Sequence, residues 1–452
     1  MHRRAFLGAL TTACAGAAAD GNWPSWRGPT FDGVAEGAGP LSWSDDRGVK
    51  WRVPVPGRGF SSPAIYGNRV FVTTAIPLAP REERPAPPPH ETPTGPNRRA
   101  GEDTKKGPGK KGGKKGASRE VEHEFALLCY DRASGRLDWK QTAARAAPHE
   151  SYRPTDGSHC NESPVTDGKH VWTWFGSRGV FCHDMEGKLA WTRDLGVKLR
   201  IHHEYGEGTS PVLDGGMLYL KADHEAGSFL MALDAKTGST VWRADRDEPT
   251  SHSCPLPLTH QGRRQLIATG SNRVRSYDAR TGEVLWECGG LGMNPIPTPV
   301  AADGTVFAMT GYQNPMLMAI RLGGRGDITG GELVTWRNTR ANSYVPSPVY
   351  WRGKLFVLAD GGFLSCYDAR TGKPLYQQWR IGVGNIFKAS PAMADEKLYL
   401  AGENENVFVV AAGDAPRLLA TNRLAGQRFV ASPAIAGGAL FLRSESALFR
   451  IS

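Results

Sequence analysis

The sequence predicts an all-β protein that forms one eight-bladed β-propeller with four-stranded blades. Three observations predict it. A strand-turn-strand unit recurs eight times, its spacing matches one propeller blade, and Gly and Pro account for 55 and 32 of the 452 residues. Such a composition is typical of many short strands and tight turns rather than of long helices. An all-helical enzyme is therefore not expected.

Each repeat begins with a hydroxyl or thiol residue, then proline, then an alternating apolar stretch. The copies begin at Ser62, Ser163, Ser210, Cys254, Thr298, Ser347, Ser390 and Ser432. From the second copy onward they stand 42 to 49 residues apart, which is the length of a four-stranded blade. The first gap is longer because it contains a charged insertion.

A second motif follows at a fixed distance, with Asp-x-x-Thr-Gly-x-x-x-Trp as its fullest form. Its glycines stand where a hairpin needs a positive φ, and its aspartates can bond backbone donors in the turn. We expect its tryptophans to lie on outer strands and to fill the gaps between blades. The glycines are Gly135, Gly187, Gly238, Gly282 and Gly372, and the tryptophans are Trp139, Trp191, Trp242, Trp286 and Trp336.

The eighth copy ends at Ser452 without an outer strand. Residues 49–53 precede the first copy, belong to no complete blade and carry Trp51 at the position that other outer strands give to tryptophan. Pairing this segment with the carboxy-terminal blade closes the ring and leaves no long unpaired edge. The propeller is therefore expected to span residues 20–452.

Six cysteines follow the first 19 residues. Cys129, Cys182 and Cys366 each stand two residues before a motif aspartate, where other copies have alanine or serine. This position needs a small buried side chain, and a free thiol serves as one. Because there is no Cys-x-x-Cys pair, neither a zinc site nor a redox pair is expected.

Residues 1–19 have the features of a removed export signal: Arg3 and Arg4, a short apolar stretch and small residues before Asp20. The Arg-Arg-x-Phe-Leu order is similar to a twin-arginine signal. A periplasmic or secreted protein is expected. Lipid attachment at Cys14 and cleavage near Ala19 both remain open. No apolar run approaches the roughly 20 residues of a spanning helix.

The formal net charge of +10 is concentrated in residues 79–119, which hold eleven Lys or Arg and five Asp or Glu. This Pro/Lys/Gly-rich insertion within the first blade has almost no apolar side chains, so it is expected to be disordered. It is either a tolerated surface insertion or a basic tether. The rest of the chain is nearly neutral, so no specific nucleic-acid binding is expected.

The Ser-Pro strands with the Asp-x-x-Thr-Gly-x-x-x-Trp motif resemble the pyrroloquinoline quinone (PQQ) repeat. Segments such as WPSWRGPTFDGVA and HHEYGEGTSP more narrowly resemble an exported, planctomycete-type group of unassigned function. The resemblance implies an eight-bladed propeller. It does not assign the chemistry, because one fold hosts many functions.

Segments before the inner strands of a propeller share one face and surround the central channel, where a ligand site is expected. In this chain these segments are polar. The candidate channel-mouth residues are Glu150, His159, Asn161, Glu162, His202, His203, Glu204, Tyr205, His252, Asn294, Asn342 and Lys388. Because neighbouring strand residues point to opposite faces, His202 and His203 are not expected to share a metal ion, and no metal site is predicted.

Two classes of function remain open. The first is a non-catalytic binding or scaffold module, monomeric, for an envelope protein or a carbohydrate. The second is a PQQ- and calcium-dependent dehydrogenase of alcohols or sugars with Glu162 or Glu204 as its base. The chain has no vicinal cysteine pair of the kind that many quinoproteins place over the cofactor. Short connections between blades also predict little material to roof a pocket, and both points favour the first class.

Overall fold

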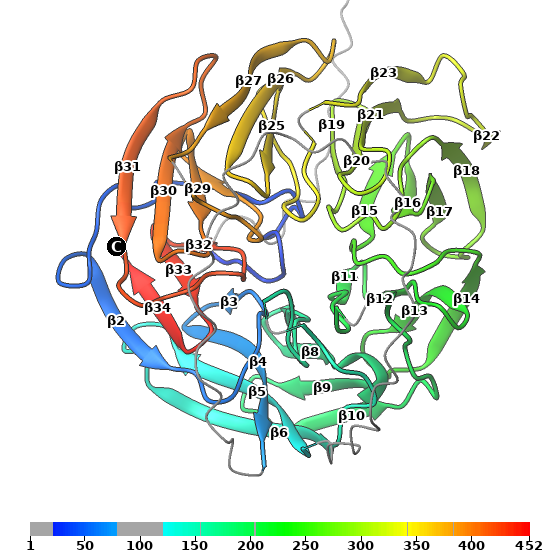
Figure 1. The fold of residues 1–452 in the computed structure, drawn as a ribbon. Coiled ribbons are helices and arrows are strands. Elements are labelled where there is room, and N and C mark those ends of the chain that lie inside the picture. Colours follow the sequence, from blue (N-terminus) through cyan, green and yellow to red (C-terminus); the bar gives the residue numbers. More distant parts are fainter. Residues whose placement is uncertain (1–20, 79–120, 154, 203–204, 341, 383) are drawn as a thin grey trace, which may run out of the picture.

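The computed structural model describes residues 21–78, 121–153, 155–202, 205–340, 342–382 and 384–452. They form eight sheets arranged as blades around a central axis, which confirms the predicted propeller (Figure 1). The predicted signal, residues 1–19, and the predicted insertion, residues 79–119, lie outside the described residues. No helix within the described ranges is long and apolar enough to cross a bilayer.

The strands of each blade are given from the axis outward. Blade 1 has β3 (Ala64–Tyr66), β4 (Arg69–Pro77), β5 (His123–Asp131) and β6 (Leu137–Ala146). Blade 2 has β7 (Val165–Thr166), β8 (His170–Trp174), β9 (Val180–Asp184) and β10 (Leu189–Arg193). Blade 3 has β11 (Val212–Asp214), β12 (Met217–Ala222), β13 (Ser228–Asp234) and β14 (Thr240–Arg246). Blade 4 has β15 (Leu256–His260), β16 (Arg263–Gly270), β17 (Arg273–Asp278) and β18 (Val284–Gly289).

Blade 5 has β19 (Val300–Ala302), β20 (Thr305–Thr310), β21 (Met316–Arg321) and β23 (Val334–Asn338). Blade 6 has β24 (Val349–Trp351), β25 (Lys354–Ala359), β26 (Phe363–Asp368) and β27 (Pro374–Arg380). Blade 7 has β28 (Ala392–Ala394), β29 (Lys397–Ala401), β30 (Asn406–Ala411) and β31 (Leu418–Arg423). Blade 8 has β32 (Ala434–Ala436), β33 (Ala439–Arg443), β34 (Ala447–Ile451) and β2 (Val49–Pro54). The short strands β1 (Val34–Ala35) and β22 (Gly326–Asp327) pair in parallel with β28 and β18, and η1 (Gly176–Arg178) is a 3-10 turn.

The ring closes as the sequence predicts. Strand β2 pairs antiparallel with β34, in the register Val49 with Ile451 and Val53 with Leu448. The outer strand of the last blade therefore comes from the amino-terminal part of the chain. This pairing joins the two ends of the propeller, since undoing it would expose the edge of β34.

Tryptophans on the outer strands join each blade to the next. The Trp191 ring of blade 2 lies against the turn of blade 3, where a Cβ added to Gly238 would be 2.6 Å from the ring. The Trp191 Nε1–H donates to the Ala235 carbonyl of the same turn over 3.1 Å. Trp51, Trp139, Trp242 and Trp336 repeat both contacts in their own neighbouring blades. The glycine is required because any side chain there would displace the indole.

Trp286 of blade 4 departs from this pattern. It is buried in one cluster with Val306 and Met318 of blade 5, as expected of a residue between blades. However, the corresponding turn of blade 5 lacks the glycine motif, and the Trp286 Nε1 has no hydrogen-bond partner among the described residues. Strand β22 covers the outer edge of β18 here instead.

The hydroxyl residues that define the repeat form a ring around the axis. The backbone N–H of each donates to the side-chain oxygen of the next over 2.8 to 3.0 Å, in the order Ser62 to Ser163, Ser163 to Ser210, Cys254 to Thr298, Thr298 to Ser347, Ser347 to Ser390, Ser390 to Ser432, and Ser432 back to Ser62. At the remaining position the Ser210 N–H faces the Cys254 thiol. The ring explains why a small hydrogen-bonding side chain recurs in every blade.

All six cysteines of the described residues are buried and free, which confirms their predicted packing role. Burial raises the pKa of the Cys129, Cys182 and Cys366 thiols to about 12. They are therefore protonated and inert, as is usual for buried structural cysteines.

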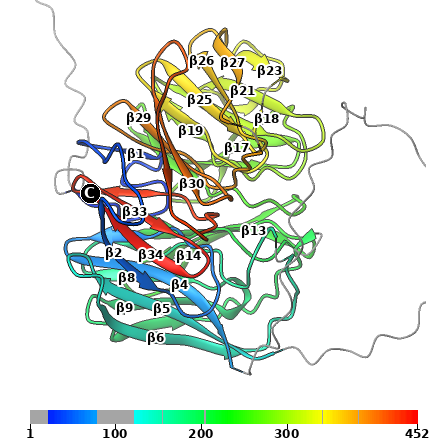
Figure 2. The same cartoon turned by 60° about the vertical axis from the view of Figure 1, so that its left-hand side comes forward.

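Residues 21–35 lie across the lower face, defined here as the face that carries the turns between first and second strands. Trp23 and Ile65 of blade 1 exchange backbone hydrogen bonds of 2.9 and 2.7 Å, and β1 joins blade 7 (Figure 2). The Arg27 guanidinium is buried and donates to the carbonyls of Pro391 and Pro348, in blades 7 and 6. This segment therefore ties several blades together and closes the lower end of the channel.

Candidate functional site

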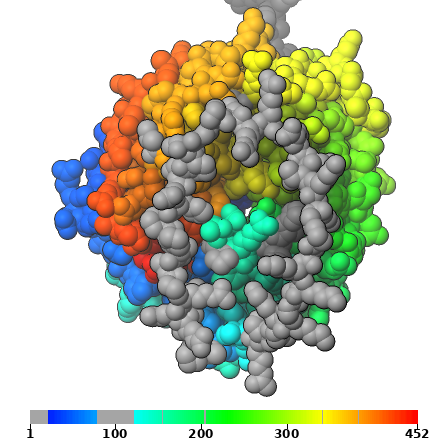
Figure 3. Space-filling view, viewed as in Figure 1, coloured from blue at the N-terminus to red at the C-terminus, as the bar shows by residue number. Residues whose placement is uncertain are grey.

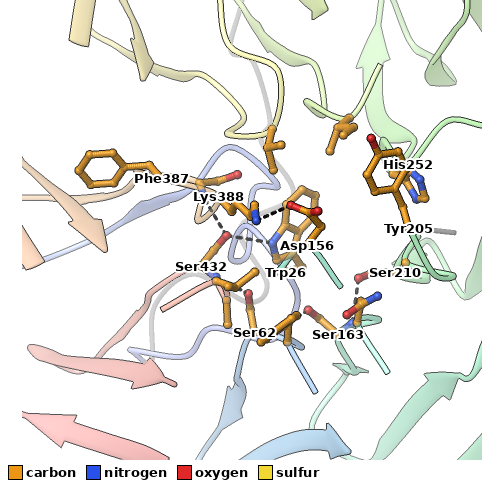
Figure 4. Close-up of a pocket in the computed structure, with 18 of the residues that line it drawn as sticks. Trp26, Ser62, Asp156, Ser163, Tyr205, Ser210, His252, Phe387, Lys388 and Ser432 are labelled. Carbon is orange, nitrogen blue, oxygen red and sulfur yellow. Dashed lines mark hydrogen bonds and ion pairs between the residues drawn. The ribbon is translucent and has the colours of Figure 1, made fainter. Parts of the chain in front are cut away.

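A cavity of about 350 Å³ lies on the axis above the ring of hydroxyls. Ser62, Ser163, Ser210 and Ser432 form its floor together with Trp26, whose Nε1–H donates to the Ser432 Oγ over 3.4 Å (Figure 4). Aromatic and aliphatic residues form its walls: Phe60, Tyr205, Ile296, Tyr344, Val345, Ile386 and Val430. Phe387 also borders the cavity, but its ring points away from it (Figure 4) and packs in the core with Phe408. Because Trp26 fills the floor, the cavity opens on the upper face only.

The connection between blades 1 and 2 covers part of this upper mouth. The Asp156 carboxylate forms an ion pair with the Lys388 ammonium over 2.7 Å. The Thr155 carbonyl accepts hydrogen bonds from the side chains of Lys388 and Arg428. Figure 3 shows this segment, in cyan-green, over the centre of the face. The prediction that little material roofs the mouth is therefore wrong, because ion pairs to a distant blade hold this connection over the axis.

Further ion pairs surround the roof. Lys388 also contacts Glu403 over 3.3 Å, and Arg428 contacts Glu403 and Glu445 over 2.6 Å each. Arg58 reaches Glu445 over 2.9 Å. These pairs join blades 7 and 8 to the roof. Lys388 and its partners are therefore fixed rather than free in the channel.

Asp360 is a lining residue that the sequence did not single out. It follows β25 in blade 6, and its two carboxylate oxygens accept the N–H groups of Tyr344 and Val345 over 2.8 and 3.0 Å. Burial raises the pKa of its carboxyl group, with the two backbone hydrogen bonds acting in the opposite direction. Asp360 gives the cavity wall a second carboxylate beside Asp156.

Four of the predicted mouth residues line the cavity: Asn161, Tyr205, His252 and Lys388. The Asn161 amide is oriented by its donation to the carbonyls of Ser158 and Glu207 over 3.0 and 2.9 Å. Burial lowers the pKa of His252 to about 4, and its Nε2 lacks a partner in the described part of the chain. His252 is therefore a neutral side chain of the cavity wall, and its Nε2 is buried.

Glu162 faces away from the central cavity. It lies in a separate small cavity of about 10 Å³ together with Glu207, Lys221 and Asp223. Burial, and then the charge of Glu207, raise the pKa of Glu162 to about 8, although the Asn161 N–H donates to its Oε2 over 3.0 Å. Asn161 and Glu162 thus face different cavities, as adjacent residues of an extended segment do.

The remaining predicted residues support the loops around the mouth. Glu150 accepts the Ile201 N–H over 2.8 Å, and the ring of His159 packs on Tyr152 with 4.4 Å between centroids. His202 donates its N–H to the Thr250 Oγ1 over 3.0 Å, Asn294 donates to the Tyr344 hydroxyl over 3.0 Å, and Asn342 donates to the Asn338 carbonyl over 3.1 Å. The other two predicted residues, His203 and Glu204, lie outside the described residues.

The lining residues match a PQQ group poorly. That quinone carries several carboxylates and would need cationic partners, but among the described lining residues Lys388 is the only Lys or Arg, and it already holds two acids. The same wall adds the carboxylates of Asp156 and Asp360. No three His, Cys, Asp or Glu within the described ranges are placed to hold a metal ion such as calcium. We therefore derive no step through a quinone.

The fold and the repeat together define a PQQ-type eight-bladed β-propeller. A model of the family described as outer membrane protein assembly factor BamB matches residues 124–349 and 327–449, which is more than half of the chain. The chain therefore belongs to this family.

Individual relatives are distant. The outer membrane protein assembly factor BamB of Yersinia pestis is 24% identical in an alignment of 235 residues, and the match covers 40% of this chain and 58% of that protein. The chain thus matches little more than half the length of this curated relative. The crystal structure of BamB from Moraxella catarrhalis is similar with a TM-score of 0.52, 14% identity and coverage of 72% of this chain and 88% of that one. The structure of quinohemoprotein alcohol dehydrogenase from Comamonas testosteroni is similar with a TM-score of 0.61 and 9% identity, and the match covers 96% of this chain and 81% of that one. At these identities the structures show a common fold only.

Proposed function

We propose that this protein is an exported, non-catalytic recognition module of the cell envelope that binds its partner at the upper mouth. The observation that carries the proposal is the cavity that is closed from below by Trp26, lined by aromatic side chains and partly roofed by fixed ion pairs. Such a site holds a protruding group in one orientation. It also has an exposed apolar rim residue, Ile386, with 52% of its side chain exposed.

Membership of a family described as an outer membrane protein assembly factor supports the envelope assignment. The twin-arginine-like signal proposed for residues 1–19 agrees with export to the periplasm or beyond. The partner is a protein or a carbohydrate of the envelope, and the module acts as a monomer. A partner that inserts one side chain or one sugar ring fits a cavity of about 350 Å³, which lies within the roughly 300–1,000 Å³ of ligand sites.

Site-specific photo-crosslinking in intact cells tests this proposal. A photo-reactive amino acid replaces Ile386 at the mouth, and a control replaces Val284 on the outer strand of blade 4. The two side chains are matched, with 52% and 51% exposed. We expect one discrete adduct from position 386 and none from position 284. Equal labelling from both positions, or none from 386, would count against a binding site at the mouth.

The alternative function is a PQQ- and calcium-dependent dehydrogenase, with Glu162 or Glu204 as its base. The likeness to the Comamonas enzyme supports it at the level of the fold. The placement of Glu162 outside the central cavity and the charge of the lining residues oppose it. Binding of the quinone, measured directly, distinguishes the two functions.

A further inference from the structure

We propose that the central cavity receives the ammonium or guanidinium group of a basic side chain on a protein partner, with the Asp360 carboxylate as its counter-ion. This inference rests on the recognition function proposed above and names the chemistry of the group that is recognised. Four features of the cavity lead to it: a carboxylate without an ion pair, a roof whose cations are already engaged, aromatic walls, and a suitable size.

Asp360 is the carboxylate without an ion pair. Its oxygens accept the N–H groups of Tyr344 and Val345 over 2.8 and 3.0 Å, which fix the side chain in the wall of the cavity. No ion pair joins it to any residue that the structure describes. Asp360 is half-buried. A charge held there without a counter-ion is costly, and a cationic ligand would reduce that cost.

The cations around the roof cannot take this role, because each is held by other acids. Lys388 is paired with Asp156 and Glu403 over 2.7 and 3.3 Å. Arg428 and Arg58 are paired with Glu403 and Glu445. Three cations and three acids thus balance one another above the cavity. The charge of Lys388 also acts on Asp360, but no ion pair joins the two side chains in the described part of the chain. The lining residues include one cation, Lys388, and two carboxylates, Asp156 and Asp360. This excess of negative charge disfavours an anionic ligand.

The aromatic residues of the mouth already attract cations within this chain. The Arg153 guanidinium lies 5.0 Å from the Tyr205 ring centroid, and those of Arg58 and Arg428 lie 5.4 and 5.8 Å from that of Phe60. Within the described ranges, Tyr344 is a lining aromatic with no such guanidinium. Its backbone N–H binds Asp360, and both residues line the cavity. The Tyr344 ring packs on one side against Tyr312, with 5.3 Å between centroids. Together the Asp360 carboxylate and the Tyr344 ring offer a charge and a π face to the same cation.

The size of the cavity points to a side chain rather than a large ligand. Its volume of about 350 Å³ is near the lower end of ligand sites, which span roughly 300–1,000 Å³. Trp26 blocks passage through the channel from below. A lysine or arginine that protrudes from a partner can therefore enter from above, while the surrounding backbone of the partner stays on the rim near Ile386.

Titration calorimetry of the whole chain with small probes tests the inference. The probes are N-acetyl-arginine amide, N-acetyl-lysine amide and the neutral isostere N-acetyl-citrulline amide. We expect saturable binding of both cations and at least about tenfold weaker binding of the citrulline compound, because a charged hydrogen-bonded pair supplies that difference. Equal affinity for arginine and citrulline amides would overturn the assignment of a cation.

Two variants locate the binding group. Asp360→Asn should weaken binding of the arginine amide at least about tenfold while leaving the citrulline amide unchanged. Asp303→Asn serves as the control and should change neither, because Asp303 lies in the turn between β19 and β20 on the lower face and does not line the cavity. Because Asp360 also binds two backbone N–H groups, the double variant Lys388→Met with Asp156→Asn provides a second test that leaves these bonds intact, frees no second carboxylate in the lining and keeps Glu403 paired with Arg428. Removing this opposing cation should strengthen cation binding several-fold, and a weakening would refute the proposal.

The cation assignment and the recognition function can fail separately. A specific adduct at position 386 without cation binding would retain the mouth as a recognition site and reject the basic side chain. If neither the adduct at position 386 nor cation binding is observed, the recognition function itself is rejected.

Discussion

Replacing Gly238 with alanine should destabilise the propeller because it would separate blade 2 from blade 3. Gly238 has a φ of +72°, and a Cβ there would lie 2.6 Å from the Trp191 ring. Alanine at a positive φ costs about 1–2 kcal/mol, and overpacking adds about 1–3 kcal/mol. The expected loss in the free energy of unfolding is therefore about 2–5 kcal/mol.

Gly216→Ala in the same blade is the matched control. Its φ is +78°, but an added Cβ there meets no atom within 4 Å, so only the backbone cost of about 1–2 kcal/mol applies. Urea unfolding of the two variants and the natural protein, followed by tryptophan fluorescence, measures both losses. If the two variants lose the same stability, the stacking of tryptophan on glycine does not hold neighbouring blades together, and this reasoning is refuted.

Two further predictions concern buried charges beside the cavity. Asp223→Asn should lower the free energy of unfolding, measured in urea, by about 3–5 kcal/mol. It leaves Lys221 and Arg246, which lie 2.9 and 2.6 Å from Asp223, without their shared carboxylate. The control Asp138→Asn, on an exposed pair with Arg136, should cost less than about 1 kcal/mol. Glu162→Gln should stabilise the protein increasingly as the pH rises from about 4.5 to about 8, because the folded carboxyl group keeps its proton up to about pH 8 while the unfolded one ionises near 4.5. Below pH 4.5 the Glu162→Gln variant and the natural protein should be equal in this respect. Glu186→Gln, which changes a carboxylate whose side chain is 73% exposed, is the control. A pH-independent difference would show that Glu162 is not the buried acid described.

The architecture could be predicted because the same two local contacts recur from blade to blade. A ring of side chains hydrogen-bonded from blade to blade requires a small hydroxyl or thiol in every copy, and each tryptophan requires a glycine in the next turn. Both requirements leave a periodic trace in the sequence. Closure by β2 followed from the missing outer strand of the last copy.

The cavity could be predicted only in part, since its decisive contacts are not periodic. The roof depends on the pair of Asp156 with Lys388, which are separated by 232 residues. Asp360 was missed because it lies between the second and third strands of blade 6 and carries no motif. Glu162 was placed at the mouth, but its orientation is opposite to that of Asn161. The role of Trp26 and Arg27 under the channel depends on their packing against blades distant in sequence.

Calorimetric titration of the protein with PQQ in the presence of calcium, followed by dye-reduction assays over alcohols and aldoses, tests the recognition function most directly. A non-catalytic module whose cavity carries two carboxylates and an engaged lysine should give no saturable binding of the quinone and no turnover. Saturable binding with dye reduction that disappears in Glu162→Gln would contradict it and identify the protein as a dehydrogenase.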